Sequence, residues 1–174
     1  ATFTIDGGMY AISTNIGQGN SVDIIDLNDP ENLVVVDSET DGVNGFTMLD
    51  GSYNVDTFTI GASTYAIVAA EDDDGVQIID VSDPTDIVAL DTLTDSDANT
   101  ILDGPVGVDT FTIGASTYAI VASQQSDGVQ MIDVSDPTNI VPLDSETDDV
   151  TGFDLLQYPK DVDIFTVGES TYAI

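Results

Sequence analysis

The chain has 174 residues, of which 33 are acidic and one, Lys160, is basic, so its formal net charge at pH 7 is −32. It contains no Cys and no His, which excludes a disulfide framework, a thiolate metal site and a histidine general base. One lysine cannot neutralise a phosphate backbone, so we expect no nucleic-acid partner. Hydrophobic residues make up 41% of the chain, which separates it from disordered acidic tails.

The acidic residues are biased in type, with 28 Asp and only 5 Glu. Asp forms turns well and helices poorly, whereas Glu favours helices. The bias therefore predicts a protein of strands and turns. No apolar run approaches the ~20 residues of a transmembrane helix, so we expect no membrane insertion. The chain begins abruptly at Ala1, as a processed or excised chain would, so the lack of a signal peptide does not argue for the cytoplasm.

A repeat of about 54 residues dominates the sequence. Phe-Thr-(Ile/Val) triplets begin at Phe3, Phe58, Phe111 and Phe165, with spacings of 55, 53 and 54 residues. Segments of the form Ile-Asp-(Leu/Val)-(Asn/Ser)-Asp-Pro end at Pro30, Pro84 and Pro137. We therefore divide the chain into repeat 1 (1–54), repeat 2 (55–107), repeat 3 (108–160) and a partial repeat 4 (161–174).

Each repeat is expected to contain four strands. In repeat 2 these are Val55–Ile60, Thr64–Ala69, Val76–Val81 and a strand from Ile87 through Leu90 to about Thr92. A hairpin loop containing Gly61 joins the first two strands, and Asp83-Pro84 ends the third, because proline cannot donate to a ladder. A longer link, Thr94–Gly107, leads to the next repeat. Asn44–Leu49 and Phe153–Leu156 could each form one helical turn at most.

Four short antiparallel strands per repeat are typical of a β-propeller blade. The fold class is therefore expected to be all-β, with tandem four-stranded antiparallel blades that form one β-propeller-like unit or propeller segment. Repeats 1 to 3 are full blades and repeat 4 is partial. The recurring residues Phe58, Phe111, Tyr65 and Tyr118, with Phe165 and Tyr172, are expected to pack in the core rather than to bind a ligand. A stack of β-sheets that is not a propeller is the alternative.

The amino-acid sequence of the repeat points to a particular family more specifically than the number of strands does. Gly-Val-Gln-Ile-Ile-Asp-Val-Ser-Asp-Pro-Thr (75–85), preceded by Tyr-Ala-Ile-Val-Ala, closely resembles the LVIVD-repeat family of β-propellers. The resemblance covers nearly the whole chain. It implies a secreted or cell-surface protein of a family that generally lacks assigned chemistry. The period departs from that family by about ten extra residues, which lie in the link between the fourth strand and the next repeat.

The C-terminus falls in the middle of an expected strand, at Ile174, where the sister strands continue with Val-Ala. An open sheet edge would be left there, which is an aggregation hazard. The chain is therefore expected either to be a fragment of a longer array or to pair with another copy through its open C-terminal strands.

The links offer candidate calcium loops. Asp95, Asp97, Asn99 and Asp103 place oxygen donors at alternate positions, as at the start of a calcium loop, although Thr100 stands where an EF-hand has glycine. The sister links keep part of the pattern, with Asp41, Asn44 and Asp50 in the first and Asp148, Asp149 and Asp154 in the third. A solvated acidic loop is the alternative. The Asp residues of the Ile-Asp-Val-Ser-Asp-Pro turns are expected to bond nearby backbone amides.

No residue set suits catalysis. Ser63 and Ser116 lie in expected hairpin loops without a histidine or lysine partner, so no catalytic residue and no enzyme are predicted. The sequence favours a non-enzymatic extracellular or cell-surface module of tandem blades, as part of a surface layer, sheath, filament or adhesin. The alternative is a propeller module that binds calcium, a glycan or a protein. Calcium is the one cofactor that the sequence points to.

Overall fold

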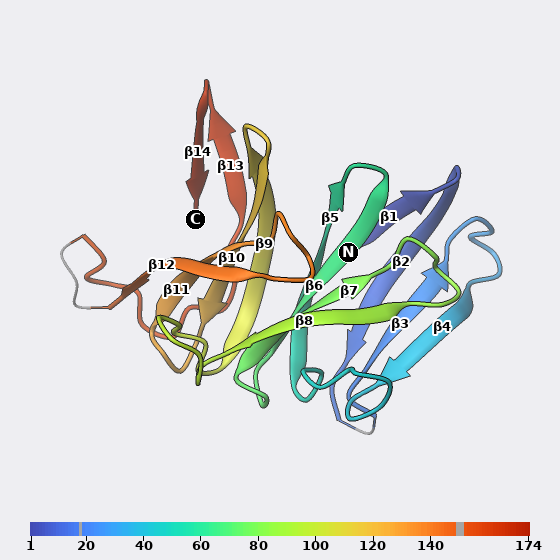
Figure 1. Ribbon diagram of the computed structural model, residues 1–174, viewed down its shortest axis with the longest axis horizontal. Coiled ribbons are helices and arrows are strands. Elements are labelled where there is room, and N and C mark those ends of the chain that lie inside the picture. Colours follow the sequence, from blue (N-terminus) through green and yellow to red (C-terminus); the bar gives the residue numbers. More distant parts are fainter. Residues whose placement is uncertain (18, 149–151) are drawn as a thin grey trace.

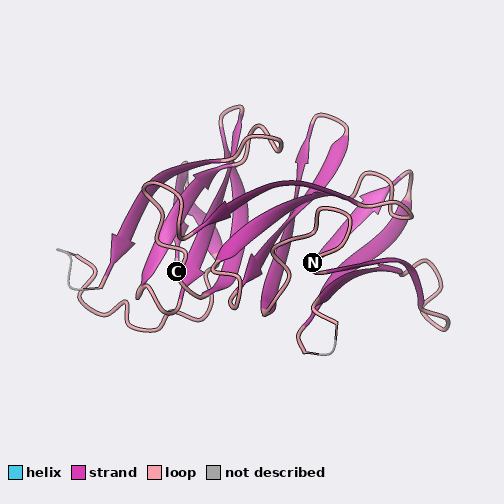
Figure 2. Cartoon of the chain, turned by 60° about the horizontal axis from the view of Figure 1, so that its bottom comes forward, coloured by secondary structure: helices cyan, strands magenta, loops and turns pink. Residues whose placement is uncertain are grey.

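The computed structural model describes residues 1–17, 19–148 and 152–174, and these residues form strands and loops without a helix (Figures 1 and 2). The strands make three four-stranded antiparallel sheets and one two-stranded sheet, each with its strands in chain order. The expected fold class is confirmed: the protein is all-β and consists of tandem four-stranded blades with a partial fourth. Over the described ranges, no helix has the length and hydropathy that a bilayer span requires.

The sheets follow the repeats. Blade 1 contains β1 (Thr2–Ile5), β2 (Gly8–Asn15), β3 (Ser21–Asp26) and β4 (Val34–Thr40). Blade 2 contains β5 (Ser52–Ile60), β6 (Ser63–Ala70), β7 (Gly75–Asp80) and β8 (Val88–Thr94). Blade 3 contains β9 (Pro105–Ile113), β10 (Ser116–Ser123), β11 (Gly128–Asp133) and β12 (Val141–Thr147). Half-blade 4 contains β13 (Ile164–Val167) and β14 (Ser170–Ala173).

Local sequence explains why each blade is a meander. The β1–β2 turn consists of Asp6 and Gly7, whose φ angles of 50° and 85° suit the tight turns that match strand twist. After the third strand, Asp83 Oδ1 accepts a hydrogen bond from the N–H of Thr85 at 3.0 Å, which closes the turn around Pro84. Asp136 does the same with Thr138 in blade 3. The expectation that these carboxylates bond nearby amides is confirmed.

The blades stack face to face through their apolar side chains. One core cluster joins blades 1 and 2, and includes Ile24, Phe46 and Ile87. A second joins blades 2 and 3 through residues such as Ile78 and Ile132. A smaller third cluster joins blade 3 to half-blade 4. Figure 1 shows the consequence: the sheets follow one another along the chain, with β5 and β9 between the outer sheets.

The recurring aromatic residues pair in every sheet, because the first two strands place them opposite each other. Phe58 and Tyr65 lie in register, and their ring centroids are 5.6 Å apart. Phe58 is buried, as expected, and Phe3 likewise. Phe165 is 43% exposed, because no further sheet covers half-blade 4 in this structure. The sequence predicted that all of these residues pack in the core, and this is wrong for Phe165 and for Tyr172, which is 48% exposed. Burial depends on the neighbouring blade, which the sequence of one repeat does not show.

The strand bounds differ from those expected at the link. β5 and β9 begin at Ser52 and Pro105, inside the residues that the sequence assigned to the link. The helical turn allowed at 44–49 is absent. Instead Val43 and Phe46 form an isolated antiparallel bridge, and Phe46 is 1% exposed in the core. The reason is tertiary, since the link folds back across the gap between two blades and closes it.

Candidate functional site

The first acidic residue of each link closes that link. Asp95 Oδ1 accepts a hydrogen bond from the N–H of Leu102 at 2.8 Å. Asp41 holds Leu49 in the same way at 3.2 Å, and Asp148 holds Leu156 at 2.9 Å. Three of the predicted calcium ligands therefore each accept a backbone hydrogen bond inside their own loop, which is a structural role that recurs in register.

Other predicted ligands also have local partners or shape the backbone. Asp97 Oδ2 accepts hydrogen bonds from the N–H of Thr94 at 2.8 Å and from its hydroxyl at 3.0 Å. Asn99 and Asn44 have positive φ angles of 67° and 52°, a conformation that Asn tolerates better than most residues. Their oxygen-donor pattern thus coincides with turn geometry.

Residues just before the third strand tie each blade to its following link. Asp74 Oδ1 accepts the N–H of Gly104 at 3.0 Å, and Asp127 Oδ1 accepts the N–H of Tyr158 at 2.8 Å. In blade 1 the equivalent Asn20 donates to the carboxylate of Asp50. All three have φ near 40–52°. The sequence analysis did not single out Asp74, because its partner lies 30 residues further along the chain.

These contacts gather carboxylates beside two of the links. Burial raises the pKa of Asp73, and the nearby carboxylates of Asp41 and Asp50 raise it further. Burial also raises the pKa of Asp103, which lies near Asp74 and Asp95. Nevertheless, over residues 1–17, 19–148 and 152–174, no three acidic side chains are arranged to hold a metal ion. Of the remaining predicted ligands, Asp154 is exposed and Asp149 lies outside the described residues.

The raised pKa of Asp73 gives a testable pH dependence. A carboxyl whose pKa is higher in the folded state stabilises the fold below its unfolded pKa of about 3.9, and that stability is lost as pH rises through the folded pKa. Asp73→Asn removes the charge and keeps an oxygen for the N–H of Asp50, which now donates to Asp73 at 2.8 Å. We expect this variant to be more stable than the native chain at pH 7, with the difference narrowing towards pH 5.

Asp83→Asn is the matched control, because hydrogen bonds from the side chain and backbone of Thr85 lower the pKa of Asp83. A lowered pKa stabilises the fold above the unfolded pKa, so this variant should be less stable at pH 7. Urea unfolding of both variants at pH 7, 6 and 5 measures the two trends. Changes of the same sign in both variants would contradict the assignment.

A second recurring carboxylate joins neighbouring blades at their outer strands. Asp37 Oδ2 accepts the N–H of Ile87 at 2.8 Å, and Asp91 Oδ2 accepts the N–H of Ile140 at 2.8 Å. In every full blade the pairing register shifts near these residues, and such bulges re-aim side chains. No sequence argument singled out these residues, although their recurrence at one repeat position was a usable signal.

Buried glutamines of the third strand hold the link that precedes their blade. Gln77 is 1% exposed; its side-chain oxygen accepts the N–H groups of Thr47 and Met48 at 3.1 and 3.3 Å, and its amide donates to Gly45. Gln130 accepts the N–H of Ile101 at 3.1 Å. The first and second links are therefore each held between a glutamine of the next blade and the core.

The face of blade 3 that corresponds to the covered faces of blades 1 and 2 is only partly covered, because half-blade 4 has two strands instead of four. Half-blade 4 covers the inner part of the blade 3 face, where Val162 is buried against Ile120 and Ala122. Its outer part is a groove of about 460 Å³. We call this cavity the blade 3 groove; its lining includes Val129, Met131, Asp144, Phe153, Leu156 and Ile174.

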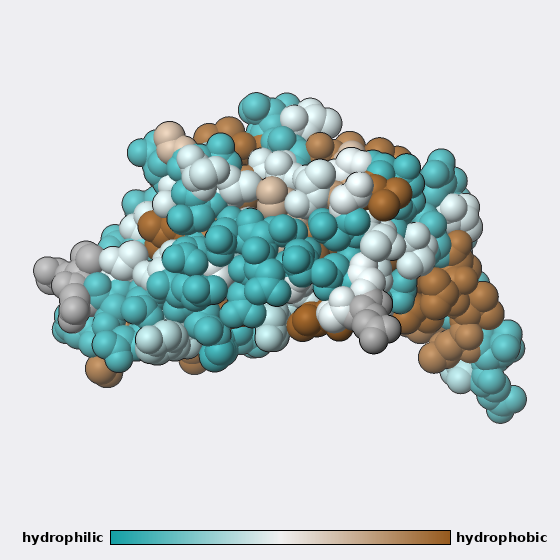
Figure 3. All heavy atoms as spheres, turned by 90° about the horizontal axis from the view of Figure 1, so that it is seen from below, coloured by the Kyte–Doolittle hydropathy of each residue, from teal (hydrophilic) through white to brown (hydrophobic). Residues whose placement is uncertain are grey.

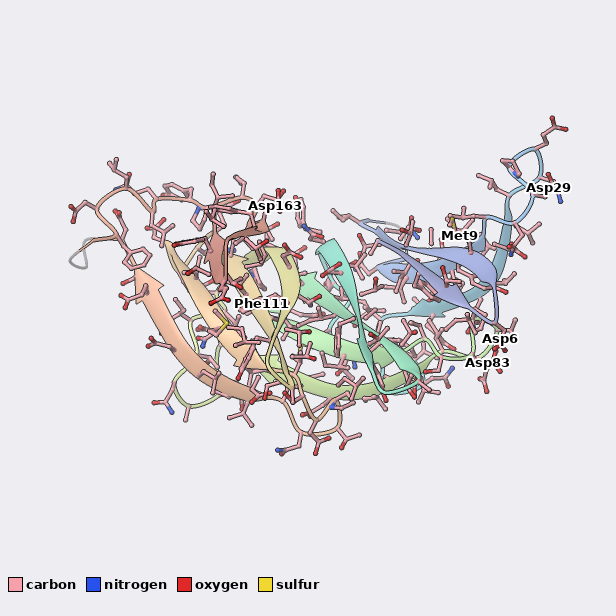
Figure 4. All side chains as sticks on the ribbon, turned by 90° about the horizontal axis from the view of Figure 1, so that it is seen from above. Asp6, Met9, Asp29, Asp83, Phe111 and Asp163 are labelled. Atoms are coloured by element: carbon pink, nitrogen blue, oxygen red, sulfur yellow. The ribbon has the colours of Figure 1, made fainter. Side chains whose placement is uncertain are left out.

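Residues of this groove match residues that are buried between the full blades. Phe153 is 37% exposed, whereas its counterpart Phe46 is 1% exposed. Asp144 occupies the repeat position of Asp37 and Asp91, and within the described residues no N–H from another blade reaches its carboxylate. Figure 4 shows Asp163 beside half-blade 4, and Phe111 on the neighbouring β9.

At the opposite end of the stack, blade 1 exposes apolar residues whose counterparts in blade 2 pack against the preceding blade. Leu33 is 60% exposed and Val35 is 53% exposed, whereas Ile87, at the repeat position of Leu33, is 3% exposed. Figure 3 shows an apolar patch at this end of the molecule, beside an otherwise largely hydrophilic face. Asp29 lies at the tip of the adjoining connection (Figure 4). Both ends of the stack thus present unfilled inter-blade surfaces.

Comparison with known proteins supports the architecture alone. No protein-family model matches the sequence, and no curated protein matches it. Among solved structures, the chain is similar to a crystal structure of a protein from Lactobacillus plantarum, with 17% sequence identity and a TM-score of 0.54. The match covers 80% of this chain and 39% of that chain, so this chain corresponds to well under half of its structural neighbour.

Fold and neighbour together define the class: a protein of β-propeller-like tandem blades, which the described residues present as an open stack. At this level of sequence identity the likeness shows the fold and nothing of activity.

Proposed function

We propose that the chain is a non-enzymatic structural or interaction module of tandem β-blades that acts outside the cell, as part of a surface layer, sheath, filament or adhesin. The proposal includes membership of the LVIVD-repeat family, which the amino-acid sequence of the repeat favours. It also includes self-association through the open C-terminal strands, and it assigns neither a nucleic acid nor a membrane as partner.

One observation carries the assembly part of the proposal: the inter-blade surface is exposed at both ends of the stack. Exposed apolar residues gather at blade 1 and at half-blade 4, where Val167 is 62% and Ile174 is 83% exposed. Contiguous apolar surfaces of this kind mark interaction sites in soluble proteins. The free edge of β14 adds unpaired backbone groups, which favour pairing with another chain.

The charge supports an extracellular, salt-rich setting. A net charge of −32 on 18.2 kDa keeps a protein soluble and attracts cations to its surface. In this proposal the carboxylates hold links and blades together by accepting backbone hydrogen bonds, and they provide the solvated face of the assembly.

Calcium binding is the second candidate, and the raised pKa values of Asp73 and Asp103 favour it. A cation between neighbouring carboxylates would relieve the repulsion that contributes to those shifts. In this alternative the module is a propeller whose loops bind calcium, a glycan or a protein.

Sedimentation velocity of the intact chain at micromolar concentration tests the assembly proposal. We expect species larger than the 18.2 kDa monomer. Ile174→Asp should shift the distribution towards monomer, because it places a charge on the most exposed apolar residue of the last strands. Ile113→Asp is the matched control, since Ile113 is 57% exposed in the β9–β10 hairpin of blade 3. A compact monomer at all concentrations would contradict the proposal.

A further inference from the structure

The fourth strand of each full blade forms the outer edge of its sheet. Over residues 1–17, 19–148 and 152–174, it pairs with the third strand on one side and with no strand on the other. Blade 2 lies between blades 1 and 3, and core clusters join it to both. The free edge of its β8 therefore belongs to a blade whose two faces are packed. Such edges carry unpaired backbone groups, at which a second chain can add a strand.

The hydrogen-bond pattern shows which backbone groups of β8 face outward. The N–H of Asp95 donates to the carbonyl of Asp74 at 2.8 Å, so these two residues form a hydrogen-bonded pair. The alternation of an antiparallel ladder then turns the N–H groups of Thr94 and Thr92 away from β7. The N–H of Thr94 does bond outside the sheet, to Asp97 Oδ2 at 2.8 Å.

The other half of β8, before its bulge, follows from a proline in blade 3. Ala89 pairs with its third strand at the same register position as Pro142. A paired proline has no N–H for the ladder, so this position turns its N–H side to the free edge. Ala89 therefore points its N–H outward. So does Ile87, two residues before it, whose N–H is bonded by the Asp37 carboxylate at 2.8 Å.

The three full blades differ at this edge. In blade 1 the N–H of Ser38, at the repeat position of Thr92, is bonded by Asp37 Oδ1 at 2.8 Å. In blade 3, Pro142 offers no N–H at all. In blade 2, within the part of the chain that the structure describes, the N–H groups of Ala89 and Thr92 have no hydrogen-bond partner outside their own sheet. Blade 2 therefore keeps an open edge where its two neighbours have a blocked one.

We call residues 88–93 of β8 the blade 2 edge, and its side chains define what it can accept. Val88 is 49% exposed, so an apolar side chain opposite it gains contact. Asp91 lies within the edge, and the exposed Asp86 and Asp95 stand just beyond its two ends. Repeat 2 contains no basic residue. The edge therefore repels an acidic strand, including a copy of itself, and favours lysine or arginine opposite its carboxylates.

We propose that the blade 2 edge binds an extended, basic segment of a partner protein, which adds to β8 as a fifth strand. The backbone of the segment pairs with the outward groups of Ala89 and Thr92. Its lysine or arginine side chains face the carboxylates that border the edge, and an apolar residue covers Val88. This is strand addition at a sheet edge. It deepens the proposed interaction role, on which it rests, by naming a partner other than a second copy of this chain.

The probe is a fluorescent acetyl-(Lys-Val)3-amide peptide, which is basic, prone to form strands and about as long as the edge. Fluorescence anisotropy with the intact chain in 0.15 M NaCl should show saturation at one peptide per chain. A peptide of the same sequence with every backbone N–H methylated keeps the charge but cannot donate to a ladder. It should bind at least about tenfold more weakly. The acidic peptide acetyl-(Glu-Val)3-amide should not bind.

Protein variants locate the site. Ala89→Pro removes an outward N–H and should fold, because Pro142 pairs at the same register position in blade 3. It should weaken binding of the basic peptide at least about tenfold. Val35→Pro makes the same change at the matched position of blade 1, and should alter the affinity less than twofold. Melting followed by circular dichroism checks that both variants fold.

A charge variant tests the site without changing the backbone. Asp86→Lys should weaken binding of the basic peptide about threefold or more. Asp6→Lys makes the same charge change at an exposed turn of blade 1, and should have a smaller effect. Three results would each overturn the proposal: no saturable binding at 200 μM peptide, equal binding of the methylated peptide, and binding that neither Ala89→Pro nor Asp86→Lys weakens more than its control.

Sedimentation velocity with and without the basic peptide separates this inference from the proposed self-association. If the chain self-associates but does not bind the peptide, the edge proposal fails and self-association stands. If the peptide binds to a chain that stays monomeric, the edge proposal stands and self-association fails. Peptide binding that leaves the assembled species intact would support both, because the partner and the second copy would then use different surfaces.

Discussion

Phe46→Ala should lower the free energy of unfolding by about 3–5 kcal/mol, the usual cost of truncating a buried phenylalanine. Phe46 is 1% exposed and lies in the cluster that joins blades 1 and 2. Its loss would leave a cavity between the link and two sheets, where backbone contacts limit collapse. Urea unfolding followed by far-UV circular dichroism measures the change as a shift of the midpoint at constant slope.

Phe153→Ala is the matched control, because Phe153 holds the same place in the third link but is 37% exposed. We expect it to cost less than about 1 kcal/mol, in line with a side chain that lacks its covering strands. Equal losses for the two variants would contradict the difference in burial between Phe46 and Phe153.

Raising NaCl from 0.05 to 1 M should increase the melting temperature by about 5–10 °C. The net charge of −32 opposes compaction, and salt shortens the range of that repulsion from roughly 14 to 3 Å. A relief of about 2–3 kcal/mol corresponds to this shift in a domain of this size. Differential scanning calorimetry across the salt series measures it, and a melting temperature that does not depend on NaCl would contradict the electrostatic argument.

CaCl2 at matched ionic strength should raise the melting temperature more steeply than NaCl if the acidic links bind calcium. Asp103→Asn should then reduce the extra effect, because Asp103 lies beside Asp74 and Asp95. Asp86→Asn removes the same charge from an exposed turn and should leave the extra effect unchanged. Equal slopes for the two salts would remove the case for specific calcium sites.

The strands were predictable because their signals are local. Every full repeat has alternating β-branched residues, a glycine in its first turn, such as Gly61, and a proline that ends its third strand, such as Pro84. The same local signals therefore predict the strands of each blade. The strand starts at Ser52 and Pro105 were missed because they depend on pairing with Ala70 and Ser123, at the far end of the second strand of the same blade. In both cases the chain extends the first strand of its blade into the link.

The candidate site was only partly predictable. The sequence indicated the acidic links and offered calcium loops or solvated loops as their role, and calcium binding there stays a prediction. The structure adds that Asp41, Asp95 and Asp148 each accept a backbone hydrogen bond that closes a loop. Sequence reasoning passed over Asp37 and Asp91, because an Asp in a fourth strand looks like any solvated carboxylate. Their partners lie 50 and 49 residues away, in the next repeat.

The sequence by itself determined the unit of this protein: a repeat of about 54 residues, four strands long, acidic and free of histidine and cysteine. Tertiary structure alone decided which copies of each residue are buried. Phe46 and Phe153, or Ile87 and Leu33, hold equivalent repeat positions, yet one of each pair is buried and the other exposed. The physical reason is that a blade buries its faces only against neighbouring blades, so the burial of each copy depends on which blades lie beside it in the structure.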